Sequence, residues 1–154
     1  MLRGALFSAL ESAGADFSQV LDLYAGTGAL GIEALSRGAA QATFVERDRG
    51  MCAVIRENLA LTGFAEQAQV ICSPAERALE RPGGGYTLVL ADPPYADTQA
   101  HAVLERLAAS GKVEPGKTTI ALEHSARGEP GAKLGPFTLV KTLKHGDTAV
   151  SLYR

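Results

Sequence analysis

Cysteine is scarce in this chain of 154 residues, where only Cys52 and Cys72 occur. Because the sequence has no cysteine cluster, it predicts neither disulfides nor a zinc site, and it indicates a reduced, cytoplasmic protein with both thiols in its core. Long apolar runs are also missing, since none approaches the roughly 18 residues that indicate a membrane-spanning helix. We therefore expect no membrane association and no bound metal.

A strong excess of basic charge is missing too, because the net charge is −2. A balance of this sign does not indicate nucleic-acid binding. The distribution is uneven, however: residues 111–154 hold seven Lys and Arg against four Asp and Glu, a net of +3, and the remainder holds eight against thirteen, a net of −5. The basic part includes Arg127, Lys133, Lys141 and Lys144, which we expect to lie next to the ligand-binding edge of the sheet. It fits a phosphate-facing surface as well as an ordinary solvated one.

The chain shows no internal repeat, no low-complexity segment and no long linker, so residues 1–154 are expected to form one domain. Apolar runs bounded by turn signals predict strands at 20–24, 42–46, 69–72, 86–91, 118–123, 137–144 and 148–153. Helical patterns predict helices at 2–13, 29–37, 48–62, 74–81 and 97–110, the last of them capped by Asp97 or Thr98, and a loop at 125–136. The alternation predicts a Rossmann-like α/β fold: a mostly parallel seven-stranded sheet with helices on both faces and an antiparallel last strand.

The most informative segment is Asp92-Pro93-Pro94-Tyr95, which follows an apolar run that ends at Ala91. The exocyclic amine of a base is a poor nucleophile, because its lone pair is delocalised into the ring. The Asp92 carboxylate and the Pro93 carbonyl can each accept one N–H of such an amine, which aims the nitrogen lone pair at an electrophile. The prolines stiffen the turn, and Tyr95 can stack on the base. The four residues also suit a plain turn after a strand.

A second motif consists of Gly26, Gly28 and Gly31, which follow the apolar run 19–24 and fit the pattern G-x-G-x-x-G. Such a turn can bind a pyrophosphate on the backbone N–H groups at a helix N-terminus. Asp22, at the end of the strand below the turn, would repel a pyrophosphate and attract the ammonium of an amino-acid moiety. S-adenosylmethionine has such an ammonium and no phosphate, so the order of acid and glycines favours this cofactor over NAD.

An acidic residue also ends the next predicted strand. Glu46 lies about 20 residues past the glycines, where a carboxylate can bind both ribose hydroxyls of the cofactor. Alternatively, Glu46 is a solvated acid near the positive end of the next helix. Ligands bind beyond the carboxyl ends of the strands in such sheets, so Asp22, the glycine turn, Glu46 and residues 92–95 are expected to meet at one edge.

Together these residues resemble the class I S-adenosylmethionine-dependent methyltransferases, and within that class the bacterial 16S rRNA guanine-N2 methyltransferases of the RsmD type. The resemblance covers nearly the whole chain and is carried by Arg3 and by residues 5–7, 21–31, 33–39, 44–46 and 92–95. It implies methyl transfer to the exocyclic N2 of a guanine in 16S ribosomal RNA, with S-adenosylhomocysteine as the product. It also implies a monomeric protein whose partner is ribosomal RNA in a small-subunit particle.

Two features depart from the pattern of this family. The family has a basic segment before the position of Arg3 that is expected to help hold RNA, and this chain begins within that region, so we expect weak binding to naked RNA. The family also tends to place Asn or Asp after the third strand to hold the adenine amine, where this chain has Pro74. Because Pro74 offers no side-chain acceptor, we expect Ser73 or the backbone of Ala75 and Glu76 to hold adenine.

The implied mechanism is in-line transfer of the sulfonium methyl to a base that has been splayed out of its stack. The expected catalytic residues are Asp92, Pro93 and Tyr95. The residues expected to contact the cofactor are Asp22, Gly26, Gly28, Glu46, Ser73, Ala75 and Asp92. The residues expected to contact the base or the RNA are Pro94, Tyr95, Lys141 and Lys144.

The acceptor and the class of protein stay open at the level of the sequence. Adenine N6, cytosine N4 and the amide of glutamine all present an NH₂ group, and residues 92–95 do not separate them from guanine N2. A cofactor-binding module without catalysis and an NAD-binding dehydrogenase also fit a glycine turn after a strand, and Asp22 argues against the dehydrogenase.

Overall fold

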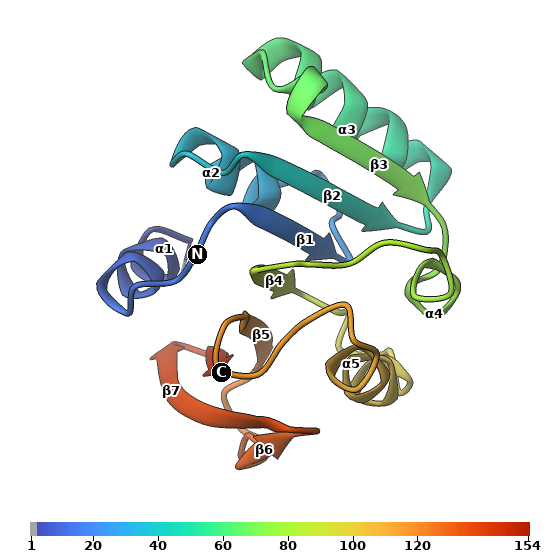
Figure 1. Ribbon diagram of the computed structural model, residues 1–154. Helices are drawn as coiled ribbons and strands as arrows, with labels where there is room; N and C mark the ends of the chain where they lie inside the picture. Colours follow the sequence, from blue (N-terminus) through green and yellow to red (C-terminus); the bar gives the residue numbers. More distant parts are fainter. Residues whose placement is uncertain (1–2) are drawn as a thin grey trace.

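The computed structural model describes residues 3–154 and contains an eight-stranded sheet in the order β3-β2-β1-β4-β5-β8-β7-β6, with helices on both faces (Figure 1). The strands that pair in parallel are β1 (Gln19–Leu23), β2 (Gln41–Glu46), β3 (Ala68–Cys72), β4 (Leu88–Ala91) and β5 (Thr119–Ser125). The strands that pair in an antiparallel manner beyond β5 are β6 (Lys133–Leu134), β7 (Phe137–His145) and β8 (Thr148–Tyr153). The predicted fold class is confirmed.

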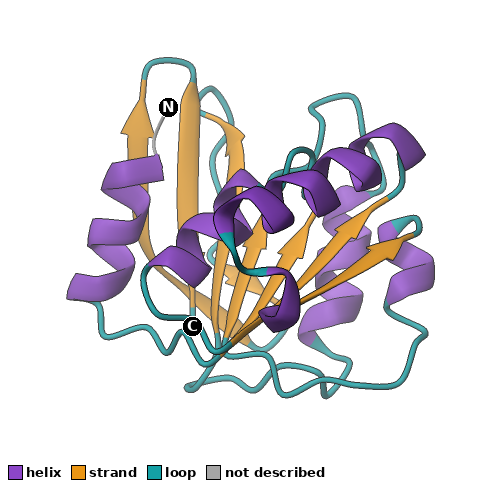
Figure 2. Cartoon of the chain, turned by 90° about the horizontal axis from the view of Figure 1, so that it is seen from above, coloured by secondary structure: helices purple, strands orange, loops and turns teal. Residues whose placement is uncertain are grey.

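Each face of the sheet has its own apolar core. The helices on one face are α1 (Arg3–Ser12), α2 (Ala29–Ser36) and α3 (Arg49–Thr62), and those on the other are α4 (Ala75–Ala78) and α5 (Ala100–Ala108). A short 3₁₀ helix, η1 (Ala65–Gln67), precedes β3. In Figure 2 the strands fan out between these two layers of helices. None of the helices within residues 3–154 has the length and apolar character needed to cross a membrane.

Helix α3 shows how local sequence determines an element. The Asp48 side chain accepts hydrogen bonds from the N–H groups of Gly50 and Met51, which caps the helix. Cys52, Ile55 and Leu59 recur on one face and are buried. At the other end, Gly63 adopts the left-handed conformation with φ of 81° and ends the helix. The predicted start and end of this helix are confirmed.

The C-terminal hairpin inserts β8 between β5 and β7, so β8 is antiparallel to both neighbours. The antiparallel last strand was therefore predicted correctly, but the number of strands was wrong. Lys133 and Leu134 lie in the predicted loop 125–136, yet they pair with Thr138 and Phe137 and form β6. A two-residue strand held by one buried side chain, Leu134, is too short to show a periodic pattern.

Two further expectations were wrong. Cys52 is a buried free thiol as expected, whereas Cys72 is exposed because β3 is the edge strand of the sheet. Helix α5 begins at Ala100 and its capping position is Gln99, so neither Asp97 nor Thr98 caps it. Asp97 instead accepts from the N–H of Gln99 in the turn before the helix. The expected start of the first helix at Leu2 lies outside the described residues.

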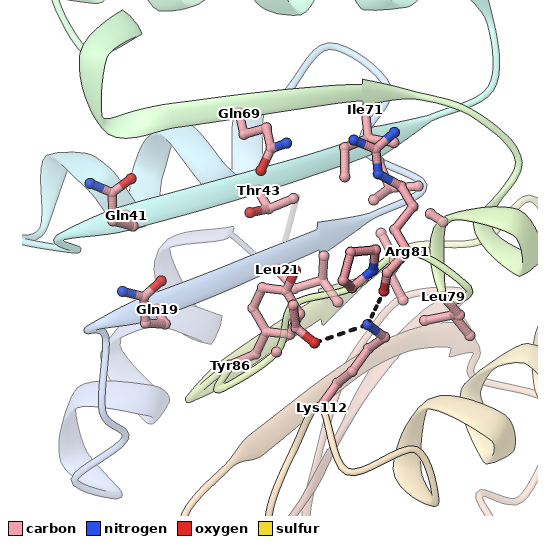
Figure 3. A pocket seen from close by; sticks show the side chains of 16 residues that line it. Gln19, Leu21, Gln41, Thr43, Gln69, Ile71, Leu79, Arg81, Tyr86 and Lys112 are labelled. Atoms are coloured by element: carbon pink, nitrogen blue, oxygen red, sulfur yellow. Dashed lines mark hydrogen bonds between the residues drawn. The ribbon is translucent and has the colours of Figure 1, made fainter.

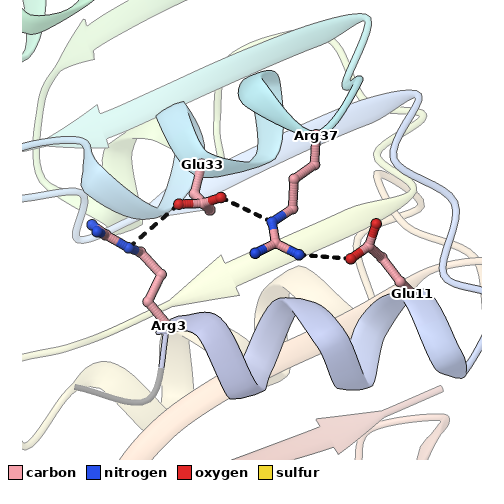
Figure 4. A network of polar contacts seen from close by, with 4 residues as sticks. All are labelled: Arg3, Glu11, Glu33 and Arg37. Carbon is pink, nitrogen blue, oxygen red and sulfur yellow. Dashed lines mark hydrogen bonds and ion pairs between the residues drawn. The ribbon is translucent and has the colours of Figure 1, made fainter.

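Four charged residues hold α1 against α2, and all of them except Glu11 come from the stretches that carry the family resemblance (Figure 4). Arg37 Nε lies 2.8 Å from Glu33 Oε2 and its Nη1 lies 2.6 Å from Glu11 Oε1, while Arg3 Nε lies 3.5 Å from Glu33 Oε1. The Arg37 guanidinium also lies 5.3 Å from the centre of the Phe7 ring. These residues therefore dock a helix rather than face the carboxyl edge of the sheet.

Candidate active site

Asp22 lies in the interior at the carboxyl end of β1, with 1% of its surface exposed. The N–H of Gly31, in the first turn of α2, donates to its Oδ2 at 3.0 Å. Burial raises the pKa of Asp22 well above its ordinary value, the hydrogen bond from Gly31 opposes this rise, and the neighbouring Asp92 and Glu46 add to it. A cation beside this carboxyl would therefore relieve the cost of ionising it.

The glycine turn between β1 and α2 is tied to Glu46 at the end of β2. Gly26 and Gly28 have φ of 58° and 82°, the left-handed region that residues with a side chain rarely adopt. The N–H of Gly26 donates to Glu46 Oε1 at 2.8 Å, and the N–H of Asp48 donates to Oε2 at 2.9 Å. Both carboxylate oxygens are thus oriented by the backbone, and each still has a lone pair for another donor such as a ribose hydroxyl.

Gly31 allows α2 to approach the sheet closely. A Cβ at this position would lie 2.3 Å from Cε2 of Phe44 and 3.0 Å from Asp22 Oδ2. The third glycine of the motif is therefore required for packing between helix and strand, as in other sheets of this kind.

The register of the sheet brings the acidic residues to one edge. Asp22 pairs with Phe44 on β2 and with Leu90 on β4, so Glu46 and Asp92, each two residues further along, flank the position just beyond Asp22. Residues two apart on a strand point to the same face. Asp22, Glu46 and Asp92 therefore converge at the carboxyl edge on the face covered by α1, α2 and α3.

The segment Asp92 to Tyr95 leaves β4 as an open turn. The N–H of Asp97 donates to the carbonyl of Pro94 at 2.9 Å, which fixes the end of this segment. Within residues 3–154, no backbone N–H donates to the carbonyl of Pro93. Asp92 is exposed, and 68% of the surface of Tyr95 is exposed, an unusual value for a large aromatic side chain. Two acceptors and an aromatic face are thus available at the same point.

Glu123, another acid at this edge, is not among the site residues expected from the sequence. The pairing of Ala91 with Leu122 places Asp92, just past the end of β4, beside Glu123, which lies within β5 two residues before its end. Their carboxyl groups are within hydrogen-bonding reach, and this contact, together with burial, raises the pKa of Glu123 to about 8. The signal that could have identified it was present, because the predicted strand 118–123 ends in an acid, as the second predicted strand does at Glu46.

Ser73 and the start of α4 lie beside Glu46. The N–H of Ser73 donates to the carbonyl of Glu46 at 2.9 Å, and its hydroxyl donates to the carbonyl of Pro74 at 3.0 Å. Pro74 stands at the capping position of α4 and makes no side-chain cap. The first N–H groups of a helix have no partner inside it, so Ala75 and Glu76 offer donors next to the hydroxyl oxygen of Ser73.

The lysines of the basic region do not form one patch. Strand β7 runs parallel to β1–β5, so its carboxyl end lies at the edge that carries the acids. Lys144 lies there, in the same row as His124, which follows Glu123, whereas Lys141 lies further back along β7. Lys133 pairs with Thr138 near the start of β7, at the opposite edge. The expectation that Lys133 adjoins the site was therefore wrong.

A separate cavity lies on the face of the sheet that carries α4 and α5 (Figure 3). It has a volume of about 300 Å³ and is lined by residues such as Gln19, Gln41 and Gln69. Lys112 closes one side by donating to the carbonyls of Arg81 and Gly83. None of the acids at the carboxyl edge lines it. Among residues 3–154, no three His, Cys, Asp or Glu side chains are arranged to hold a metal ion.

A mostly parallel sheet, an antiparallel strand beyond β5, and a glycine turn between acidic strand ends define the class I methyltransferase fold. A solved structure from Escherichia coli, "Putative methyltransferase yhhF", is 33% identical, with a TM-score of 0.86 over 99% of this chain and 84% of that one. An RNA methyltransferase from Salinibacter ruber, in complex with S-adenosyl-L-homocysteine, shares the fold with a TM-score of 0.69 at 18% identity, over 97% of this chain and 89% of that one.

The chain belongs to the RsmD family, whose model, described as "Conserved hypothetical protein 95", matches residues 1–154. "Putative rRNA methyltransferase YlbH" of Bacillus subtilis is 33% identical over 142 residues, which are 90% of this chain and 77% of that protein. "Ribosomal RNA small subunit methyltransferase D" of Haemophilus influenzae is 30% identical over 140 residues, which are 89% and 72% of the two chains. The family expected from the sequence is confirmed, and its named relatives are RNA methyltransferases.

Proposed function

We propose that this protein transfers the methyl group of S-adenosylmethionine to the exocyclic N2 amine of a guanine in 16S ribosomal RNA, acting in the cytoplasm as a monomer on a small-subunit particle. The observation that carries the proposal is the open turn at Asp92 to Tyr95. It presents a carboxylate, a carbonyl and an exposed aromatic ring at the edge where Asp22 and Glu46 converge. The names of the relatives support ribosomal RNA of the small subunit as the substrate.

The acids at the edge fit this cofactor. S-adenosylmethionine carries a positively charged sulfonium and an ammonium, and when bound it supplies an electrophilic methyl group. Burial first, and then repulsion from Asp92 and Glu46, raise the pKa of Asp22. A cationic ligand removes that repulsion. Glu46, oriented by the N–H groups of Gly26 and Asp48, is suited to bind the ribose hydroxyls. Ser73 and the first N–H groups of α4 are suited to bind adenine.

Residues 92–95 would orient the acceptor amine. The Asp92 carboxylate and the Pro93 carbonyl accept one N–H each, and Tyr95 stacks on the splayed base. The amine nitrogen then points its lone pair at the methyl carbon. The amine becomes acidic as the new N–C bond forms, so Asp92 need not be a strong base to receive the proton. Catalysis of this kind depends on positioning and electrostatics.

The test is a methyl-transfer assay on unmodified 16S ribosomal RNA, naked and assembled with small-subunit proteins, with the product nucleoside identified by mass spectrometry. We expect N2-methylguanosine. Asp92→Ala should lower turnover by roughly 100-fold or more, because it removes a contact that is made mainly in the transition state, while the affinity for S-adenosylmethionine stays nearly the same. Glu66→Ala changes an exposed acid far from the edge and should have no effect.

Two results would contradict the proposal. N6-methyladenosine or N4-methylcytidine as the product would show that the chemistry is right and the base is wrong. Full turnover by Asp92→Ala would show that the amine is held elsewhere.

A further inference from the structure

We infer that Glu123 determines which base is methylated: its carboxylate accepts the N1–H of the guanine whose N2 amine is held by Asp92 and Pro93. This inference rests on the proposed function and adds a residue to its base pocket. It concerns Glu123, an acid at the carboxyl edge to which the proposed function gives no part in binding the cofactor or in orienting the amine.

The geometry begins with the pairing of β4 and β5. Ala91 pairs with Leu122, so Asp92, the first residue after β4, lies level with Glu123 of β5, which is itself paired with Val150 of β8. Glu123 is half-buried and lines a small cavity together with Leu6 of α1. Its carboxyl is in hydrogen-bonding contact with that of Asp92. Two acceptor groups therefore stand next to each other, one from each strand.

The chemistry of the bases separates guanine from its competitors at this point. Guanine carries N1–H directly beside its N2 amine, so its edge presents two neighbouring donors. Adenine carries a bare N1 beside its N6 amine, and cytosine a bare N3 beside its N4 amine, and both bare nitrogens are acceptors. Once ionised, the Glu123 carboxylate would accept the N1–H of guanine, whereas it would face a lone pair in the other two bases. Sites with buried polar groups discriminate strongly against partners that leave those groups unpaired.

The contact between the two carboxyls also suits this role. Without a ligand, the pair holds a proton, as the pKa of Glu123 near 8 indicates. The two donors of guanine can replace that proton, so each carboxylate obtains an N–H partner when the base enters. If the two side chains served only to stabilise the fold, two carboxyl groups would not be needed. An amide at either position would form the same hydrogen bond without repulsion between charges.

The decisive substrate is 2-aminopurine placed at the target nucleotide, once mass spectrometry has located that nucleotide. It keeps the exocyclic N2 amine of guanine but has a bare N1. We expect the wild-type protein to methylate it at least about 100-fold more slowly than guanine. Glu123→Gln can donate an amide N–H to the bare N1, so the preference for guanine over 2-aminopurine, measured as the ratio of kcat/KM values, should fall at least about 10-fold.

Glu129→Gln is the matched control, because it changes an exposed acid in the loop after β5 and should leave the preference unchanged. A second substrate needs no variant: 1-methylguanine at the target nucleotide lacks the N1–H, and the wild-type protein should methylate it poorly. Equal preference in Glu123→Gln and wild type, or rapid methylation of 1-methylguanine, would overturn the role of Glu123 and leave guanine-N2 methylation standing. If the wild-type protein forms no N2-methylguanosine at all, the proposed function fails first.

Discussion

Asp22 combines two requirements that oppose each other. It must be ionised to bind an ammonium, yet it is buried and lies next to other acids, which raise its pKa. The hydrogen bond from Gly31 offsets part of this cost. The ionised form of Asp22 is therefore unfavourable in the free protein. A cation that binds beside it stabilises this form, and part of the affinity for the cofactor comes from that stabilisation.

The variant Asp22→Asn separates charge from shape. The asparagine oxygen can still accept from the N–H of Gly31, so the fold should be as stable as in the wild type or slightly more stable. Affinity for S-adenosylmethionine should fall by roughly 1–3 kcal/mol, the range of a charge-assisted hydrogen bond. Calorimetric titration measures this change, and Asp147→Asn, an exposed acid in the turn between β7 and β8, is the control. Unchanged affinity in Asp22→Asn would remove Asp22 from the site.

Glu123 makes stability depend on pH in a defined direction. Its pKa rises from 4.5 to about 8 in the folded protein, chiefly through the contact with Asp92. The stabilisation from its bound proton is therefore complete below pH 4.5 and is lost as the pH rises through about 8. Because Glu123→Gln stays neutral, its melting temperature relative to the wild type should increase as the pH rises across this range. A difference in melting temperature between the two proteins that is the same at every pH would contradict the raised pKa of Glu123.

At the scale of elements, the site depends on how closely α2 packs against β1 and β2. Gly31 makes this approach possible, because its missing side chain leaves room for the Phe44 ring. The same backbone N–H that packs against the sheet also donates to Asp22. Packing and binding are therefore coupled through a single turn of helix.

Gly31→Ala tests this coupling. The added methyl group would overlap Phe44 and press on Asp22, so we expect a loss of roughly 1–3 kcal/mol in the free energy of unfolding together with weaker cofactor binding. Gly4→Ala on α1 is the matched control, because no atom lies within 4 Å of its added Cβ, and it should cost nothing. Urea unfolding and calorimetry measure the two effects. A Gly31→Ala protein with wild-type stability would show that the helix can shift without cost.

At the scale of the whole molecule, the lysines of the C-terminal region lie at opposite edges of the sheet. Lys144 lies at the edge that carries the acids, and Lys133 lies at the opposite edge. The net charge of −2 gives the protein as a whole no attraction for a phosphate backbone. An RNA strand that reaches the site would therefore depend on the cations at its own edge.

Binding to naked 16S ribosomal RNA should accordingly be weak and should fall steeply with salt, because phosphate contacts release counterions. Lys144→Glu should lower the affinity further, while Lys133→Glu, with the same change of charge at the other edge, should have little effect. Fluorescence anisotropy over a range of salt concentrations measures both. Equal losses in the two variants would indicate a general effect of net charge, and tight binding at physiological salt unaffected by Lys144→Glu would contradict the proposed contact surface.

Local patterns in the sequence determined the elements and much of the candidate site. The apolar run before Asp92, the glycines after Asp22 and the cap at Asp48 are signals within a few residues, because strand ends, tight turns and helix starts depend on nearby backbone conformation. The order of strands and helices also placed Asp22, Glu46 and Asp92 at one edge, since parallel strands bring their carboxyl ends together.

Only the tertiary structure decided which strand ends become neighbours and how far apart the basic residues lie. The contact between Asp92 and Glu123 depends on the pairing of β4 with β5. These strands are neighbours in the sheet but are separated in the sequence by α5, so the pairing is not a local feature. The exposure of Cys72 and the separation of Lys133 from Lys144 follow from strand order and direction in the same way. The pattern of apolar residues in a strand predicts which of its side chains are buried. The register between strands depends on the packing of the whole sheet.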